Sequence, residues 1–330
     1  DLEVSEIELM GSLHQVFFSL PRICNHCVNP ACVAGCPTGA IYKRGEDGIT
    51  LVDQKQCRGW RQCVAACPYK KVYFNWARLK AGKCIYCYPL LERNQIPACF
   101  QSCTGRARYI GYLFYDADRV EEVAKCPTHA LVEAQRSIIL DPSDPAVALE
   151  ARRSGISAEV LSAAARSPVY RLVVDWKLAF PLHPEFRTLP MAFYVPPVLP
   201  QRADRATEGT TDADAPKVAN DRIVKYLARL LTGENEAEIR QAMRKMVAVR
   251  KYQWALSLGT EHLEASGKAL ENAGLTPAVG QEIWKLAANA SAVERFVLAG
   301  SEPFTRLPKG RTAEAQRQSS GIGTAEEDSK

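Results

Sequence analysis

Cysteines are the residues of this chain best suited to chemistry, and eleven of its twelve cysteines follow a repeated spacing. The first group is Cys24, Cys27, Cys32 and Cys36, the second is Cys57, Cys63 and Cys67, and the third is Cys84, Cys87, Cys99 and Cys103. Every group ends in a Cys-x3-Cys step, and the first two end in Cys-Pro. Thiolates in such runs are typical ligands of iron–sulfur clusters, so we predict a protein that transfers electrons.

The spacing also predicts which thiols share a cluster. A Cys-x2-Cys loop curls around one cluster, whereas the Cys three residues further on begins a helix and points to the other cluster of a pair. Proline after that Cys suits the first helical turn, where no amide hydrogen is needed. We therefore predict a crossed pairing, with a [4Fe–4S] cluster held by a first set of Cys24, Cys27, Cys32 and Cys67.

Trp60 stands where the second group would be expected to carry its middle cysteine. Tryptophan does not ligate iron, so a second set of three thiols, Cys36, Cys57 and Cys63, is predicted to hold a [3Fe–4S] cluster. A change of cluster type shifts the reduction potential. The simpler alternative is that Trp60 packs over a cluster and shields it, which also tunes the potential.

The third group is incomplete by itself. Cys84, Cys87 and Cys99, the third set, are predicted to bind one cluster and Cys103 another, which leaves four thiolates to be supplied elsewhere. One further cysteine run would supply them, and the absence of an initiator Met before Asp1 places it upstream. Cys126 has no neighbouring cysteine and is interpreted as a thiol that binds no iron. His26 is expected to donate a hydrogen bond beside the first cluster.

Charge and composition limit the alternatives. Residues 20–110 carry 14 Lys and Arg but only four Asp and Glu, although the net charge of the whole chain is +5. A nucleic-acid surface or a solvated face would also explain this bias, but its overlap with the cysteines favours compensation of anionic clusters. Disulfides would need an oxidising compartment. A zinc-binding module would favour paired Cys-x2-Cys steps and remains the distant alternative.

The elements that must position the cysteines indicate an α+β fold, with a ferredoxin-like iron–sulfur domain and a mainly α-helical C-terminal region. Residues 39–43 and 49–52 read as a hairpin with an Asp-Gly turn. Residues 146–165 read as helix broken near Gly155, and residues 221–248 and 261–290 as helix pairs separated at Gly233 and Pro277. Residues 180–200 carry six prolines and should be extended, either over their own core or against a partner.

The expected domains follow from these elements. They are an N-terminally truncated ferredoxin-like domain (1–135), an extended and helical wrap (136–201), a linker (202–220), a helical domain (221–306) and a disordered tail (307–330). No apolar run is long enough to span a membrane.

Several motifs resemble the β subunit of respiratory nitrate reductases. They are Cys24-Asn-His-Cys-Val-Asn-Pro-Ala-Cys32, Cys57-Arg-Gly-Trp60, Cys67-Pro-Tyr-Lys-Lys71, Tyr115-Asp-Ala-Asp118, Leu140-Asp-Pro142, Ser167-Pro-Val-Tyr170, Trp176-Lys-Leu-Ala179 and Pro181 to Pro190. The β subunit of nitrite oxidoreductase is similarly close, and β subunits of perchlorate, selenate and ethylbenzene enzymes are further alternatives.

The resemblance implies an electron-transfer subunit with up to three [4Fe–4S] clusters and one [3Fe–4S] cluster, the latter accompanied in the family by a Trp at the position of Trp60. It implies two partners, a catalytic α subunit with molybdopterin and a membrane γ subunit with haem b. Electrons would pass from quinol to nitrate, or in reverse for nitrite oxidation. The chain itself should carry no catalytic residue and bind no nucleic acid. It should lie on the cytoplasmic face of the cell membrane, with the periplasmic face as the alternative.

Overall fold

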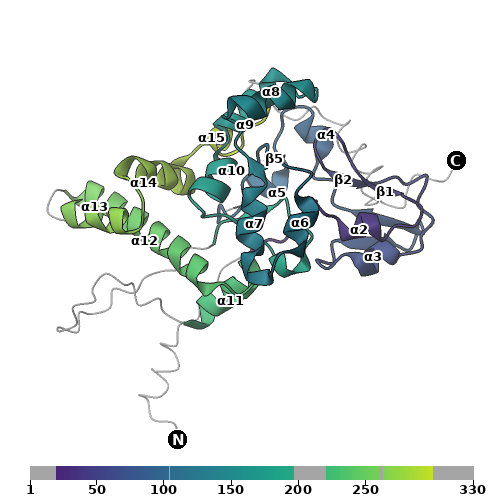
Figure 1. Cartoon of the computed structure of the whole chain (residues 1–330), viewed down its shortest axis with the longest axis horizontal. Helices are drawn as coiled ribbons and strands as arrows, with labels where there is room; N and C mark the ends of the chain where they lie inside the picture. The colour runs from purple at the N-terminus through teal and green to yellow at the C-terminus, as the bar shows by residue number, and fades with distance from the viewer. Residues whose placement is uncertain (1–19, 104, 197–220, 260–262, 300–330) are drawn as a thin grey trace, which may run out of the picture. The chain divides into compact units, whose positions relative to one another are not determined.

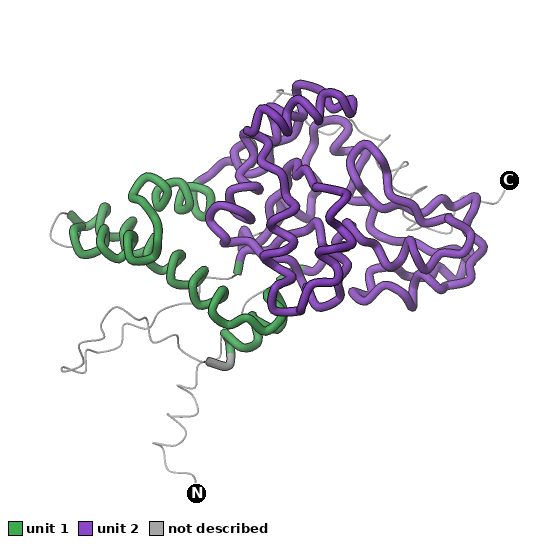
Figure 2. Tube along the Cα trace, in the orientation of Figure 1, with its two compact units in different colours: residues 1–21, 196–289 green, residues 22–195, 290–330 purple. Residues whose placement is uncertain are grey.

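The computed structural model describes residues 20–103, 105–196, 221–259 and 263–299. The chain divides into two compact units, which Figure 2 draws in purple and green. One comprises Arg22–Val195 and Ala290–Lys330, and the other Asp1–Pro21 and Pro196–Asn289. The expected linker (202–220), the expected tail (307–330) and residues 1–19 lie outside the described residues. The cysteine-bearing unit continues past residue 135, and the expected domain boundaries stay predictions.

Two similar halves form the first part of the cysteine-bearing unit (Figure 1). The first half is helix α2 (Ala31–Ala34) with strands β1 (Ile41–Lys43) and β2 (Thr50–Val52), and the second is α3 (Gln62–Ala66) with β3 (Val72–Asn75) and β4 (Lys80–Lys83). Both strand pairs are antiparallel hairpins, so the hairpin expected after the first group is confirmed. The turn between β1 and β2 contains Gly48, whose backbone is left-handed (φ +67°) and whose N–H donates to the carbonyl of Arg44 at 3.0 Å.

The core of these halves includes the predicted ligands themselves. Its buried members are Ala40, Ile41, Val52, Cys57, Cys63, Cys67, Val72 and Ala81. Helices α2 and α3 approach each other closely, since a Cβ added to Gly35 would lie 2.8 Å from the Cβ of Ala66. Small residues at this crossing therefore allow the two helices, each of which ends at a Cys-Pro step, to lie side by side.

The rest of this unit is a series of short elements, some of which form hydrophobic clusters of their own. In order they are α4 (Tyr88–Leu91), α5 (Ala98–Gln101), β5 (Phe114–Tyr115), α6 (Val120–Lys125), η1 (Thr128–Ala130), α7 (Leu131–Ser137), β6 (Ile139–Leu140), α8 (Pro145–Arg153), α9 (Ala158–Arg166), α10 (Pro168–Tyr170), η2 (Arg171–Asp175), β7 (Phe180–Pro181), η3 (Pro184–Phe186), β8 (Phe193–Tyr194) and α15 (Ala292–Arg295). Strand β5 pairs with β6 and β7 with β8, both antiparallel. The break expected near Gly155 separates α8 from α9, which confirms it.

The proline-rich segment returns to the first cysteine loop. Val28 donates its backbone N–H to Leu189 at 2.8 Å, Asn29 to Thr188 at 3.0 Å, and Met191 donates back to Asn25 at 3.0 Å. Residues 180–195 therefore wrap over their own unit, and a contact of this segment with a partner stays a prediction.

The second unit is helical, as expected. It contains α11 (Asp221–Leu231), α12 (Glu236–Leu258), α13 (Leu263–Asn272), α14 (Pro277–Trp284) and the π-helical turn η5 (Lys285–Asn289). Gly233 (φ +59°) lies between α11 and α12, and Thr276 caps α14 by accepting the N–H of Val279 at 3.4 Å. Both expected helix breaks are confirmed. No described helix combines the length and apolarity needed to cross a membrane.

Candidate iron–sulfur site

The fold brings Cys67 to the cysteines of the first group. Its thiol is an electrostatic neighbour of the thiols of Cys24 and Cys32, which means that a charge on it raises their pKa. The thiols of Cys24 and Cys32 act on Cys27 in the same way. Burial raises the pKa of Cys27 to about 12 and that of Cys32 to about 11. These thiols hold their protons at neutral pH, so iron ligation would release them. The structure thus places Cys67 with Cys24, Cys27 and Cys32, which are the four thiols of the first set.

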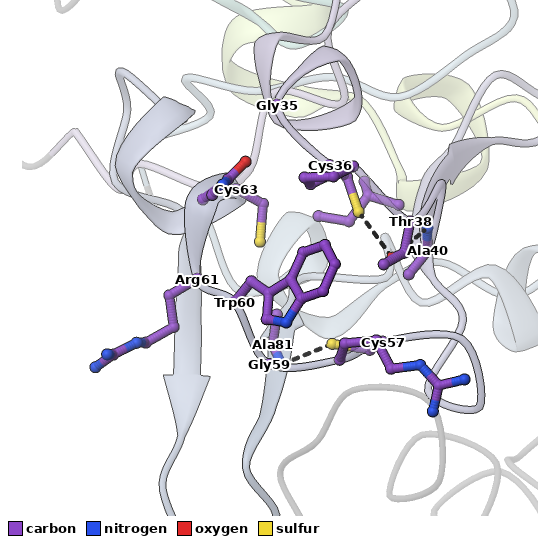
Figure 3. A pocket seen from close by; sticks show the side chains of 14 residues that line it. Gly35, Cys36, Thr38, Ala40, Cys57, Gly59, Trp60, Arg61, Cys63 and Ala81 are labelled. Atoms are coloured by element: carbon purple, nitrogen blue, oxygen red, sulfur yellow. Dashed lines mark hydrogen bonds between the residues drawn. The ribbon is translucent and has the colours of Figure 1, made fainter.

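Cys36, Cys57 and Cys63 line a second site together with Trp60 (Figure 3). The hollow has about 330 Å³ of space, part of it open to solvent. Burial raises the pKa of Cys63, and the neighbouring thiols of Cys36 and Cys57 raise it further. Trp60 is 60% exposed and lines the same hollow. The second set thus surrounds one space with three thiols and an indole.

Hydrogen bonds reach the sulfurs of this second set. The amide of Ala81 donates to Cys57 Sγ at 3.4 Å, and the Thr38 hydroxyl lies 3.5 Å from Cys36 Sγ. Burial opposes ionisation of Cys36, but hydrogen bonds from Thr38 and nearby amides outweigh it, so the pKa of Cys36 is lowered. Donors of this kind stabilise the charged sulfur of a ligand and raise the potential of the attached cluster.

The third set also forms a group. Cys87 has Cys84 and Cys99 as electrostatic neighbours, and burial raises its pKa to about 11. The backbone amide of Cys24 also donates to the Cys84 thiol, so the first and third sets are adjacent. Cys103 interacts electrostatically with Tyr109 and Arg295.

Cys126 remains outside all three sets. Its Sγ lies 3.6 Å from the carbonyl of Glu122, and its own carbonyl accepts a hydrogen bond from Arg187 at 2.5 Å. That Cys126 binds no iron stays a prediction.

The Cys24–Cys27 loop contains buried polar atoms that suit a cluster. Asn25 is 1% exposed, and neither its Nδ2 nor its Oδ1 has a partner among the described residues. His26 accepts the N–H of Thr50 at Nδ1 (3.1 Å), so its hydrogen lies on Nε2, which has no partner in the same part of the chain. The ring thus accepts a bond that sequence alone did not predict. Two buried donors without acceptors fit a group whose sulfides accept hydrogen bonds.

The described residues contain no group of three or more His, Cys, Asp or Glu close enough to hold a single metal ion. Tetrahedral zinc would bring its thiolates to within about 3.8 Å of one another, given Zn–S bonds of about 2.3 Å. Ligands of a cluster stand further apart, because iron and sulfide atoms lie between them.

Gly59 shapes the loop that presents Trp60. Its backbone is left-handed (φ +72°), and an added Cβ would overlap the carbonyl oxygen of Leu79. We expect Gly59→Ala to destabilise the folded chain by about 1–3 kcal/mol, because both the strained backbone and the overlap must be relieved. The measurement is the midpoint of thermal unfolding together with the iron content.

Gly45→Ala is the matched control, because Gly45 has no atom within 4 Å of an added Cβ and no positive φ. It should unfold at the parent temperature. Equal midpoints for the two variants would contradict the role given to Gly59.

Two contacts at the first set were not visible in the cysteine spacing. The Thr188 hydroxyl hydrogen-bonds the Cys27 thiol and lies 2.8 Å from the hydroxyl of Tyr69. The Tyr69 hydroxyl also donates to the carbonyl of Leu182 at 3.1 Å. The only sequence signal for this contact was that Tyr69 and Thr188 both fall in motifs of the resemblance.

Comparison with known proteins agrees with this geometry. A family described as "4Fe-4S dicluster domain" matches residues 15–113, and one described as "Respiratory nitrate reductase beta C-terminal" matches residues 195–277. The cysteine-bearing part of the chain therefore carries an iron–sulfur dicluster domain.

Curated relatives extend the likeness over most of the chain. The respiratory nitrate reductase 1 beta chain of Shigella flexneri is 49% identical over 86% of this chain and 55% of its own length. A respiratory nitrate reductase beta chain of Bradyrhizobium is 38% identical over 85% of this chain and 82% of its own length. The selenate reductase subunit beta of Thauera selenatis is 42% identical but covers 55% of this chain and 41% of its own length.

This chain thus spans about half the length of the Shigella relative, and most of the Bradyrhizobium one. The resemblance predicted from the cysteine motifs is confirmed. The chain belongs to the family of respiratory nitrate reductase beta chains.

Proposed function

We propose that this chain is the electron-transfer subunit of a membrane-associated molybdenum oxidoreductase that reduces nitrate. The observation that carries the proposal is the grouping of the cysteines into three adjacent thiol sets. Helices α2 and α3 connect the cysteines of the first set with those of the second. The first set is adjacent to the third set, because the backbone amide of Cys24 donates a hydrogen bond to the Cys84 thiol. Helix α2 has four residues, or about 6 Å at 1.5 Å rise per residue. Such short steps suit a relay of clusters.

The relay would hold a [4Fe–4S] cluster at the first set, a [3Fe–4S] cluster at the second and a further [4Fe–4S] cluster at the third. Cys103 would ligate one more cluster. Oxidation of a quinol yields two electrons and two protons, and reduction of nitrate to nitrite and water consumes the same number of each. The chain's own residues would ligate the clusters, keep water from the buried sets and donate hydrogen bonds to the ligand sulfurs.

The partners in this proposal are a molybdopterin α subunit, which would carry the nitrate site, and a haem b γ subunit, which would oxidise quinol in the membrane. The chain would bind peripherally on the cytoplasmic face. A nitrite-oxidising enzyme would use the same relay in reverse. The nitrate assignment is favoured over a selenate-type enzyme by the length of the matches, 86% of this chain for the Shigella relative and 55% for the Thauera relative.

Iron and acid-labile sulfide distinguish the relay from a zinc module. We expect the anaerobically purified complex to contain both in cluster proportions, with zinc at background level. Zinc in place of iron would contradict the proposal.

The purified chain without its partners should give no nitrate reduction with a reduced viologen dye, because no substrate site is predicted on it. The complete complex, assayed with the same dye, is the positive control. Turnover by the isolated chain would mean that the site has been assigned to the wrong subunit.

A further inference from the structure

A buried lysine, Lys83, ends β4 directly before Cys84. It is 1% exposed, and its Nζ donates to the carbonyl oxygens of Thr50 and Cys84, the second at 2.9 Å. Among the described residues, no carboxylate forms an ion pair with it. A buried ammonium group without an anionic neighbour is energetically costly. Its position therefore calls for negative charge nearby, and the ligand sulfurs are the candidates.

Lys83 lies between the first and third sets. It interacts electrostatically with Cys24 and Cys32 of the first set and with Cys84 of the third. Thr50, whose carbonyl it holds, donates its N–H to His26 in the Cys24–Cys27 loop at 3.1 Å. The lysine thus contacts the backbone beside one set and the backbone of the other.

Two more lysines each bind the loop of one set, which makes them natural comparators. Lys43 donates to the carbonyl of Cys27 at 2.9 Å, and the thiols with which it interacts, Cys27 and Cys24, both belong to the first set. Lys80 donates to the carbonyl of Cys57, in the second set, at 2.6 Å. Lys83 differs from both because its neighbours belong to two sets.

We propose that Lys83 is a shared positive charge that stabilises the reduced states of the first-set and third-set clusters together. This inference rests on the proposed function, since it requires clusters at both sets. Each reduction adds one electron, and hence one negative charge, to a cluster. A cation held in a poorly solvated interior favours the reduced form of every cluster near it. Lys83 would in this way raise the potentials of both neighbouring clusters and offset part of the repulsion between the electrons that they hold.

The test is Lys83→Met in the complete complex, with redox titration followed by electron paramagnetic resonance. The couples of the first-set and third-set clusters should each move to lower potential by at least 59 mV, which for one electron is a tenfold change in the equilibrium constant. The three-iron couple should keep the parent potential.

Variants of the two comparator lysines should each affect a single cluster. Lys43→Met should lower the potential of the first-set cluster alone, and Lys80→Met that of the three-iron cluster alone. Lys83→Gln keeps a hydrogen-bond donor without the charge and should behave like Lys83→Met. Lys83→Arg keeps the charge and should retain potentials near those of the parent.

The outcomes separate the possibilities. Parent potentials in fully iron-loaded Lys83→Met and Lys83→Gln complexes would overturn the proposal, as would a shift in only one of the two clusters. If Met, Gln and Arg variants all lose iron, Lys83 serves to hold the loops, and the electrostatic role is wrong. A parent complex without iron and sulfide would instead refute the proposed function, and this inference with it.

Discussion

A complex in which Cys67 is replaced by serine is expected to lose the first-set cluster and to keep the three-iron cluster. In the sequence Cys67 belongs to the second group, but in the fold it is an electrostatic neighbour of Cys24 and Cys32. It also accepts the N–H of Lys71 at 3.4 Å, a bond that suits a ligand sulfur. Serine oxygen is a poor ligand for a cluster, so one four-iron signal should disappear from the spectrum of the reduced complex.

The reciprocal variant is Cys36→Ser. Cys36 belongs to the first group in the sequence, yet it lines the hollow with Cys57 and Cys63. Its replacement should remove the three-iron signal of the oxidised complex and leave the first-set signal. Quinol-dependent nitrate reduction should fall to background in both variants, because each breaks the relay at one step.

Cys126→Ser is the matched control for both substitutions, since Cys126 is a half-buried thiol outside the three sets. Its complex should keep every cluster signal. If Cys67→Ser removes the three-iron signal and Cys36→Ser the four-iron one, the pairing is not crossed, and the ligand sets are wrong.

Trp60→Cys is expected to convert the three-iron cluster into a four-iron cluster. Trp60 lies in the second-set hollow, between left-handed Gly59 (φ +72°) and left-handed Arg61 (φ +61°). Figure 3 shows its ring beside the three thiols. A cysteine there would offer the fourth thiolate that a complete cluster needs. The oxidised three-iron signal should therefore vanish.

The potential of the converted site should fall by on the order of hundreds of millivolts, within the span of roughly −700 to +450 mV that such clusters cover. Redox titration of the complex would measure it. Trp60→Phe keeps an aromatic ring without adding a ligand and should retain the three-iron signal. A three-iron signal that persists in a fully loaded Trp60→Cys complex would mean that Trp60 only shields the cluster.

The short-range structure of the chain was predictable because it follows from local chemistry. The Asp47-Gly48 turn, the break near Gly155 and the start of a helix at Pro277 all depend on backbone preferences of one or two residues. The repeated cysteine steps predicted a dicluster domain for the same reason, since a loop of two or three residues limits which thiols can reach one cluster. Matches with known families confirm that prediction.

The sequence by itself determined the cysteine grouping, the place of Trp60 and the helix breaks, while the tertiary structure decided what surrounds them. Thr188 reaches the Cys27 thiol across more than 150 residues, and nothing in the local pattern of either segment encodes that contact. The net positive charge of residues 20–110 was visible in the sequence, but not which lysine is buried. Lys80 and Lys83 stand at the two ends of the same short strand, yet Lys80 is only partly buried, whereas the packing of β4 against β2 encloses Lys83. Burial and long-range hydrogen bonds depend on how distant segments meet, which periodicity and spacing do not specify.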